Sequence, residues 1–313
     1  MSQSGAPGPV LVIGETLIDI AQRPDQPPIE HVGGSPANVA LGLARLDHPT
    51  WLATTVGLDA RGERVREHLA EGGVRLQEQS AHGAPTSIAR AEIAPDGSAS
   101  YDFELVFSPD PIDLPPATAH IHTGSLGAIW PGSAPQVSAV LRRARAEGVS
   151  ISYDPNLRPG ALPVGVDAAE AVARVIATSD IVKASDEDVA LLHPGQPLTS
   201  VAWAWCAAGA GLVVITSGAK GVSWATAVDP SHIVELPSSA SQVVDTIGAG
   251  DSFTAGLISG LLDLGYAGSP AARDRLRRAT AEDVEHAIRR GLATSGVTVG
   301  RAGAYAPTRA EIG

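Results

Sequence analysis

The chain has 313 residues, of which 44% are hydrophobic and 18% charged, so it can bury a large core and is not intrinsically disordered. Acidic residues outnumber basic ones 34 to 22, giving a formal net charge of −12. Such a surface repels phosphate backbones and anionic lipids, so the sequence disfavours nucleic acids and membranes as partners. The single cysteine excludes an intramolecular disulfide and a cysteine-based zinc site. Residues 1–10 contain neither a basic stretch nor an apolar one, which predicts no signal peptide and a cytoplasmic protein.

Short apolar runs alternate with longer segments of helical periodicity along most of the chain. The runs are rich in β-branched residues and bounded by turn residues, and they predict buried strands at 9–14, 149–154, 180–184 and 212–216. Apolar residues recur at helical spacing in the segments 35–46, 135–147, 166–178, 249–264 and 282–295. This alternation predicts an α/β fold, a doubly wound and mostly parallel sheet with helices on both faces.

The segment 198–219 carries no charged residue and is long enough to span a bilayer. Gly209 and Gly211 interrupt it, however, and the β-prone run at 212–216 follows them. We therefore predict a short helix, a glycine turn and a buried strand in place of a membrane span.

Residues 86–107 differ from the rest because polar and apolar residues alternate in two stretches, joined by the turn sequence PDG at 95–97. This pattern predicts an antiparallel hairpin set apart from the main sheet. Together with residues around 18–33, the hairpin is expected to form a small β lid on a single domain that covers 1–313.

The string VVDTIGAGDSFTAG at 243–256 is the sharpest chemical signal in the chain. A glycine turn there leads into an apolar helix pattern, so successive N–H groups and the helix dipole, about half a positive charge, would face one spot. An anion such as a phosphoryl group fits that spot. Asp251, in the first helical turn, would lie beside the anion and could accept a proton from an attacking hydroxyl. The alternative is structural: Asp251 caps the helix and the glycines only form a turn.

Five motifs resemble, in order, those of the ribokinase-like (PfkB) carbohydrate kinases, and together they cover essentially the whole chain. The stretch 245–251 matches the signature D-T-x-G-A-G-D at every specified position. The others are a Gly-Gly turn with a following Asn at 33–46, V-G-x-D-x-x-G at 55–62, D-P-N-x-R at 153–158 and T-x-G-x-x-G at 216–221. The resemblance implies a ribokinase-like fold and an ATP-dependent carbohydrate kinase.

The resemblance also implies roles for particular residues. Asp251 would be the base, and an anion hole for the phosphoryl group would be formed by Gly248, Ala249 and Gly250. Arg158 would neutralise phosphate charge, although a solvated residue at a strand end is its simpler interpretation. The sugar hydroxyls would be bound by Asp19, Gly33, Gly34 and Asn38, which taken singly could be turn and surface residues. The nucleotide would lie against Thr216, Gly218, Gly221, Asn156 and Gly303, with Ala304 nearby.

The family's magnesium motif, N-x-x-E, is altered in this chain. The sequence SDED occupies 185–188, so Ser185 replaces the Asn and Asp188 replaces the Glu. Asp188 keeps the charge with a shorter reach and would hold Mg²⁺ through water, with Glu187 as the alternative ligand. Many relatives also hold a monovalent cation such as K⁺. Its ligands would be Asp245, the carbonyl of Ile247 and carbonyls in 297–303.

Competing motifs do not occur in the sequence. No G-x-x-x-x-G-K-[ST] pattern exists, which excludes a P-loop kinase. The sequence GAG at 209–211 resembles the start of a dinucleotide-binding fingerprint, but it precedes a predicted strand instead of following one. The histidines form no H-E-x-x-H motif, and His120 and His122, on one face of a strand, are expected to be structural.

Two further features narrow the substrate. The stretch GETLIDI at 14–20 resembles the bacterial fructokinase subgroup more than the ribokinases. The hairpin at 86–107 favours a neutral sugar over a phosphorylated one, because the acidic residues of the hairpin outnumber Arg90, its single basic residue. The acidic residues are Glu92, Asp96, Asp102 and Glu104. Fructose is the first choice; the alternatives are ribose, another neutral sugar, a nucleoside, or a non-catalytic sugar or nucleotide sensor on this fold. A homodimer is left open.

Overall fold

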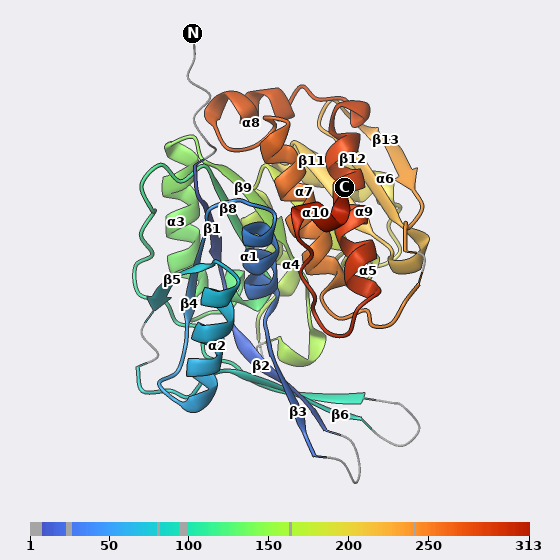
Figure 1. Ribbon diagram of the computed structural model, residues 1–313. Helices are drawn as coiled ribbons and strands as arrows, with labels where there is room; N and C mark the ends of the chain where they lie inside the picture. The colour runs from blue at the N-terminus through green and yellow to red at the C-terminus, as the bar shows by residue number, and fades with distance from the viewer. Residues whose placement is uncertain (1–7, 23–26, 80–81, 94–98, 163–164, 241) are drawn as a thin grey trace.

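The computed structural model describes residues 8–22, 27–79, 82–93, 99–162, 165–240 and 242–313. Its centre is a nine-stranded sheet in the order β13-β12-β11-β10-β9-β8-β1-β4-β5 (Figure 1). The strands from β11 to β5 are parallel to their neighbours, and β12 and β13 continue the sheet in antiparallel fashion at one edge. The predicted mostly parallel α/β sheet is therefore confirmed. The strands are β1 (Val10–Ile13), β4 (Thr50–Thr55), β5 (Arg75–Gln79), β8 (His120–Gly124), β9 (Ser150–Asp154), β10 (Ile181–Ser185), β11 (Leu212–Thr216), β12 (Val222–Thr226) and β13 (Asp229–Leu236).

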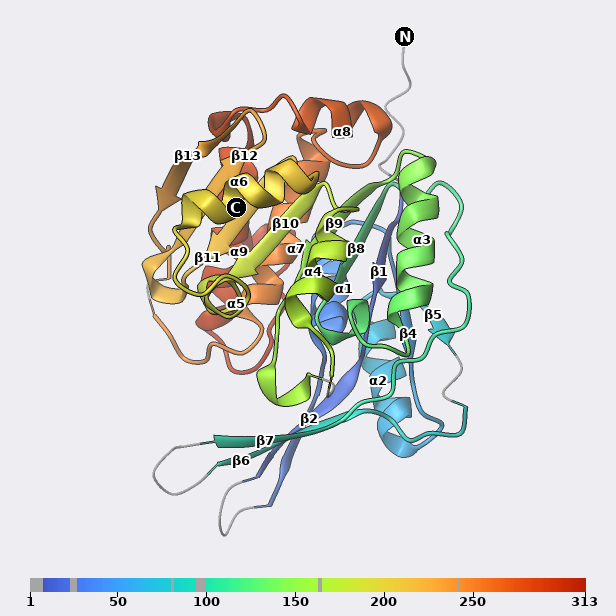
Figure 2. The same ribbon diagram turned by 180° about the vertical axis from the view of Figure 1, so that it is seen from behind.

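Helices cover both faces of this sheet. They are α1 (Ser35–Arg45), α2 (Ala60–Glu71), α3 (Ala134–Ala146), α4 (Ala168–Ile176), α5 (Asp186–Leu192), α6 (Leu198–Ala208), α7 (Ala249–Asp263), α8 (Pro270–Leu276), α9 (Ala281–Val299) and α10 (Arg309–Ile312), with 3-10 turns η1 (Leu126–Ala128), η2 (Pro159–Ala161) and η3 (Gly218–Lys220). One face carries α1, α7 and α9 (Figure 1), and the other carries α3, α4 and α6 (Figure 2). Side chains of β1 alternate between the two cores: Val10 and Val12 face one, and Leu11 and Ile13 face the other. This double burial explains why the central strands are continuous apolar runs.

A second, four-stranded sheet projects from one end of the body and is called the small sheet below (Figure 1). Its order is β3-β2-β6-β7, with β2 (Leu17–Gln22), β3 (Ile29–Gly33), β6 (Ile88–Ile93) and β7 (Ala99–Glu104). β6 and β7 pair in antiparallel fashion, and β2 runs parallel to β6. The PDG turn expected at 95–97 lies outside the described residues.

The charge-free segment at 198–219 forms α6, a glycine turn and β11, as predicted. Gly209 ends α6 with a φ of 136°, which lies in the region that favours glycine. β11 then enters the centre of the sheet, between β10 and β12. Within the described ranges, no helix is both long and apolar enough to cross a membrane.

The two histidines of β8 are buried and hydrogen-bonded to β9. The two ring nitrogens of His120 lie 2.8 Å from the hydroxyls of Ser150 and Ser152, and Nδ1 of His122 lies 2.9 Å from the Ser152 hydroxyl. Burial lowers the pKa of both histidines to about 3, so both are neutral. This arrangement agrees with the structural interpretation of the pair.

Candidate active site

The glycine turn predicted to hold an anion begins α7. Gly248 is the N-cap residue and has a φ of 74°, in the left-handed region that favours glycine. A Cβ atom at Gly248 would lie 2.6 Å from the Cβ of Ala304, so the missing side chain also lets the C-terminal loop approach the turn. The N–H of Ala249 donates to the carbonyl of Thr246 at 3.2 Å. The N–H groups that follow, at the positive end of the helix dipole, are those best placed to receive an anion.

Asp251 lies in the first turn of α7 and is 9% exposed. Its carboxylate accepts hydrogen bonds from the hydroxyl of Ser35 at 2.7 Å and from Nδ2 of Asn38 at 2.8 Å. Both donors belong to the first turn of α1, so two helix N-termini meet at this carboxylate. Gly248 caps α7 and no side chain does, so Asp251 is not the helix cap. Burial raises the pKa of Asp251, while the hydrogen bonds from Ser35 and Asn38 and two nearby cations lower it in part.

The residues expected to bind sugar meet where β2, β3 and α1 join. Asp19 of β2 pairs across the strand with His31 of β3. A Cβ atom at Gly33 would lie 2.0 Å from Oδ2 of Asp19, so glycine is required for the carboxylate to lie there. Gly34 has a φ of 100° and starts α1, on which Asn38 follows one turn later. The structure thus brings Asp19, Gly33, Gly34 and Asn38 to one side of Asp251.

The acidity of Asp19 leads to a pH prediction. Partial loss of hydration and the negative charge of Asp251 raise the pKa of Asp19 to about 6. If Asp19 binds sugar as a carboxylate, KM for the sugar should rise as the pH falls through about 6, because protonation removes the acceptor. Steady-state kinetics at a series of pH values test this. Asp19→Asn should have a high KM that no longer changes in this range, and a variant that keeps the wild-type pH dependence of KM would contradict the assignment.

The D-P-N-x-R motif follows β9 at the edge where the parallel strands end. Asn156 is half-buried and has a φ of 39°, a left-handed turn that leads the chain out of the sheet. Arg158 is exposed, and its charge acts on both Asp19 and Asp251. The guanidinium is therefore close enough to the site to meet an incoming phosphate.

Asp188, the expected magnesium ligand, is 4% exposed and engaged with protein donors. Oδ1 accepts the N–H of Leu157 at 2.7 Å, and Oδ2 accepts the N–H and the hydroxyl of Ser185 at 2.8 and 2.7 Å. Asp188 and Ser185 form the capping box that starts α5. Asp188 therefore joins α5 to the D-P-N-x-R turn, whereas Glu187 is exposed.

The T-x-G-x-x-G segment at 216–221 leads from β11 through η3 into β12. Thr216 ends β11 and donates its hydroxyl to a carbonyl of β10 at 3.3 Å. Gly218 and Gly221 have φ values of 52° and 110°. A Cβ at Gly221 would lie 2.0 Å from the carbonyl oxygen of Leu236, whereas one at Gly218 would face open space. Packing against β13 thus requires Gly221, and Gly218 leaves room beside the loop for a ligand.

Asp245 connects the segment before α7 to the C-terminal loop. Its Oδ1 accepts the N–H of Ile247 at 3.0 Å, and its Oδ2 accepts the N–H of Gly303 at 2.9 Å. These bonds bring Gly303 to the glycine turn. Because both carboxylate oxygens hold backbone N–H groups, a monovalent cation here would depend mainly on carbonyl oxygens, including that of Ile247.

Three polar residues at the site were given no role by the sequence analysis: Ser35, Lys183 and Asp154, the first residue of the D-P-N-x-R motif. Nζ of Lys183 lies 2.9 Å from Oδ2 of Asp154, and the two side chains are only 6% and 1% exposed. One signal could have found this pair. Lys183 lies inside a run predicted to be a buried strand, where an unpaired charge is too costly, so a buried acidic partner was implied. Its identity depends on the strand order, which places β9 beside β10.

Glu15 is a further buried acidic residue, next to Gly34 at the start of α1. It is 4% exposed, and its Oε2 accepts the N–H of Gly127 at 2.9 Å. A Cβ atom at Gly34 would lie 2.7 Å from the backbone carbonyl oxygen of Glu15. Burial raises the pKa of Glu15, because hydrogen bonds from Ser125 and Gly127 offset the lost hydration only in part.

Asp59 of the V-G-x-D-x-x-G motif fixes the base of the small sheet to α2. As the N-cap of α2, it accepts the N–H of Gly62 at 2.8 Å. It also accepts the hydroxyl and the N–H of Thr86 at 2.6 and 2.9 Å. Hydrogen bonding, above all from the Thr86 hydroxyl, lowers the pKa of Asp59 to about 2. Thr86 lies just before β6, so this residue couples the small sheet to the body.

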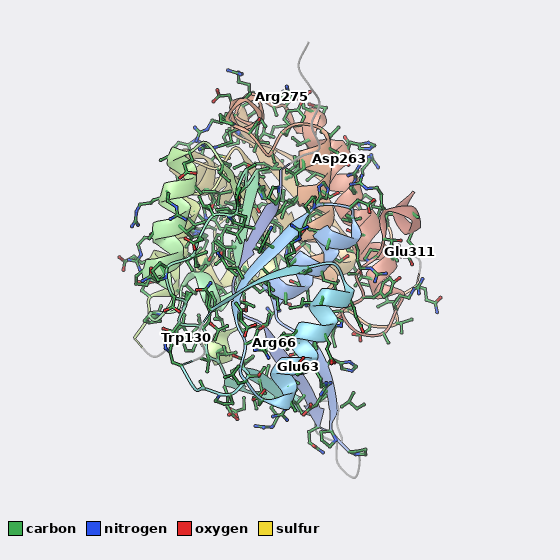
Figure 3. The ribbon with its side chains drawn as sticks, turned by 60° about the vertical axis from the view of Figure 1, so that its left-hand side comes forward. Glu63, Arg66, Trp130, Asp263, Arg275 and Glu311 are labelled. Atoms are coloured by element: carbon green, nitrogen blue, oxygen red, sulfur yellow. The ribbon has the colours of Figure 1, made fainter. Side chains whose placement is uncertain are left out.

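Arg66 of α2 connects the helix to neighbouring segments of the body. It lies beside Glu63 on the helix (Figure 3), with 3.7 Å between the charged groups. It also pairs with Glu78 of β5 and donates to the carbonyl of Gly57 at 3.1 Å. Arg66 therefore connects α2 to β5 and to the loop before the helix, from which Asp59 bonds to Thr86.

The chain is similar to known proteins along most of its length. Residues 9–311 match the family model described as pfkB family carbohydrate kinase. The chain is 34% identical over 263 residues to a fructokinase of Rhizobium leguminosarum bv. trifolii, covering 80% of this chain and 79% of the relative. It is 30% identical over 273 residues to a fructokinase of Klebsiella pneumoniae, covering 85% and 88%. A solved structure of fructokinase with bound ATP from Xylella fastidiosa superposes with a TM-score of 0.86 at 26% identity, covering 97% of this chain and 96% of that one. The chain therefore belongs to the pfkB family of carbohydrate kinases.

Proposed function

We propose that this kinase is an ATP-dependent fructokinase, which transfers the γ-phosphoryl group of ATP to a primary hydroxyl of fructose. The observation that carries the proposal is the buried carboxylate of Asp251, held by Ser35 and Asn38 at the glycine-initiated end of α7. The similarity to two bacterial fructokinases supports the sugar, and the similarity to a fructokinase with bound ATP supports the nucleotide. Since ATP is a cytoplasmic metabolite, we expect the protein to act in the cytoplasm.

In this proposal the chain positions two reactants and neutralises charge. Asp251 would orient the sugar hydroxyl and take up its proton. The transition state of phosphoryl transfer is loose, with charge spread over the equatorial oxygens, so fixed donors contribute most. Those donors would be the N–H groups of Gly250 and Asp251, because that of Ala249 is already donated to Thr246. Arg158 would add a positive charge near the same place.

The sugar-binding proposal rests on free hydrogen-bonding capacity. One N–H of the Asn38 amide is donated to Asp251, which leaves its second N–H and its carbonyl oxygen for a hydroxyl group. The Asp19 carboxylate can accept from neighbouring hydroxyls. A neutral sugar is favoured because Arg90 of the small sheet lies 3.6 and 3.5 Å from Asp102 and Glu104, so a sugar phosphate there would meet two carboxylates beside one cation.

We also infer that the small sheet acts as a lid that excludes water, which would otherwise compete as phosphoryl acceptor. Asp59→Ala should then raise the sugar KM several-fold with little change in kcat, because the lid loses its anchor at Thr86. The lost helix cap should also cost about 1 kcal/mol of stability. Asp167→Ala is a matched control, because Asp167 caps α4 through the N–H of Glu170 at 3.0 Å. Equal losses of stability with an unchanged KM in both variants would contradict the anchor.

The metal proposal is a Mg²⁺ ion carried mainly by ATP. No group of three or more His, Cys, Asp or Glu residues in the part of the chain described by the structure is arranged to hold a metal ion. Mg²⁺ is commonly bound by substrate phosphates, water and one or two carboxylates, and Asp188 is the carboxylate that we propose here. Asp188 would contact it through water, and the ion would neutralise phosphate charge.

Asp188→Ala should raise the Mg²⁺ concentration needed for half-maximal rate more than it raises the sugar KM. It removes the charge and also frees the D-P-N-x-R turn, whose Leu157 N–H loses its acceptor. Magnesium titrations at fixed ATP measure the effect. Glu187→Ala, on the exposed side of the same helical turn, is the control and should stay near wild type. The reverse result would make Glu187 the ligand.

ADP release over a panel of acceptors tests the function. We expect Mg-ATP turnover to be stimulated most by fructose, compared with ribose, glucose, a nucleoside and fructose 6-phosphate. Stimulation by ribose or a nucleoside instead would reassign the substrate within the family. Binding of sugar or nucleotide without any stimulated turnover would favour the sensor alternative.

A further inference from the structure

The ion pair between Lys183 and Asp154 is the most deeply buried one at the site. Asp154 ends β9, and Lys183 lies directly beside it in the parallel neighbour β10. The two charged groups are 2.9 Å apart and almost completely withdrawn from water. Removing both charges from water costs more than a typical pair returns, so stability alone is a weak reason for such a pair.

The pair lies directly under the start of α7. Nζ of Lys183 is 3.3 Å from the position that a Cβ at Gly250 would occupy, so glycine leaves room for the ammonium. Oδ2 of Asp154 also accepts the hydroxyl of Thr254 at 3.2 Å. The pair therefore contacts α7 on both sides of Asp251, once before it and once after it.

The charges around Asp251 are mostly negative. Glu15, Asp19 and Asp154 come from three different strands or strand ends and each is repelled by Asp251. The opposing cations are Lys183 and Arg158. Arg158 is exposed on a loop, whereas Lys183 is fixed inside the sheet.

Lys183 remains charged in this environment. Burial alone would lower its pKa, but Asp154, Asp188 and Asp251 together raise the pKa of Lys183 above its usual value. Burial raises the pKa of Asp154 to about 6, because its attraction to Lys183 offsets only part of the lost hydration. Lys183 is thus a permanent positive charge at a place where the protein has otherwise gathered carboxylates.

We propose that Lys183 is a positioning residue, whose ammonium group, fixed by Asp154 beneath Gly250, keeps the Asp251 carboxylate ionised and ready to accept the proton of the sugar hydroxyl. This proposal rests on the proposed function, in which Asp251 is the base. Lys183 itself does not take part in the proton transfer. The competing explanation is that the pair only joins β9 and β10 to α7.

The acidic limb of kcat at saturating sugar, where the effect of Asp19 on KM is removed, separates the two explanations when it is measured beside thermal unfolding. Lys183→Met leaves the Asp154 charge buried alone and should lower the melting temperature. Lys183→Met combined with Asp154→Asn removes both charges and should recover most of the melting temperature. In Lys183→Met the acidic limb should move to higher pH by about one unit, because a positive charge no longer opposes protonation of Asp251. In the double variant the shift should be smaller, because the Asp154 charge that repels Asp251 is lost as well. A folded Lys183→Met variant with a wild-type acidic limb would overturn the proposal and leave the structural explanation.

A second measurement does not need turnover. Lys183 and Lys220 are the only lysines in the sequence, so NMR of the protein with isotope-labelled lysine gives two side-chain signals, and Lys183→Met assigns them. The Lys183 signal should show one step from Asp154, which contacts it, and a further step as Asp251 is protonated. Asp251→Asn should abolish the further step, while Asp19→Asn keeps it. A Lys183 signal with the same steps in Asp251→Asn would overturn the proposal. A wild-type protein that shows the further step but no sugar-stimulated turnover would instead overturn the proposed function.

Discussion

Asp251→Asn is expected to lower kcat by at least about 10²-fold while leaving the affinities for sugar and ATP nearly unchanged. A positioned general base contributes about 10²–10⁴-fold, and asparagine cannot take up the hydroxyl proton. The local structure should survive, because the amide can still accept from Nδ2 of Asn38 and donate to the hydroxyl of Ser35. Kinetics, together with binding measured by calorimetry, test this.

The structural alternative predicts near-normal turnover for this variant, since helix capping would survive. The structure already argues against it, because Gly248 caps α7 and the Asp251 oxygens face α1. A kcat within about threefold of wild type would refute Asp251 as the base, since such a loss is far smaller than the minimum of about 10²-fold expected for a general base.

Gly248→Ala should also lower kcat by about 10²-fold. Alanine pays roughly 1–2 kcal/mol in the left-handed region, and its Cβ would collide with that of Ala304. The turn must then move, and its N–H groups would no longer point toward the phosphoryl group. Losing one such donor lowers kcat by about 10²–10³-fold in other enzymes. Kinetics and thermal unfolding of the purified variant measure both effects.

Gly195→Ala is the matched control for this substitution. Gly195 has a φ of 72°, and a Cβ there would meet no atom within 4 Å, so only the backbone cost is shared. Both variants should lose stability, but only Gly248→Ala should lose turnover. If Gly248→Ala kept the kcat of the control, the glycine turn would not be an anion site.

Much of the fold was predictable because its signals are local. The parallel strands at the centre are buried on both faces, so each is a continuous apolar run, as at 212–216. The helix expected at 249–264 is observed at Ala249–Asp263, since a glycine turn marks its start. The helix expected at 282–295 is observed at Ala281–Val299, because Thr280 caps its start and the helix continues through Gly296 to end at Gly300.

Other strands gave weaker signals. β8 carries His120 and His122 at alternate positions, so its polarity conceals a fully buried strand. The edge strand β13 has one face toward solvent, and its mixed pattern predicts little. Their places in the sheet depend on packing that no short window of sequence contains.

The candidate site was predictable only as far as its motifs reach. Gly248 and Asp251 belong to one string, but the Ser35 hydroxyl bonds to Asp251 across 216 positions of the sequence. Asp154 and Lys183 come from two strands that are neighbours only in space. The hydrogen bond from Leu157 to Asp188 likewise depends on the contact between α5 and the turn after β9, whereas the two from Ser185 belong to a local capping box. Side-chain partners of this kind follow from the strand order and not from spacing.

The central claim is that this chain transfers a phosphoryl group from Mg-ATP to fructose through Asp251. Phosphorus NMR of a reaction with the purified protein, Mg-ATP and fructose tests it most directly. We predict a new sugar phosphomonoester signal that grows in step with ADP and does not form with Asp251→Asn at the same protein concentration. ADP formation without a sugar phosphate, or a product signal of equal rate with Asp251→Asn, would contradict the account.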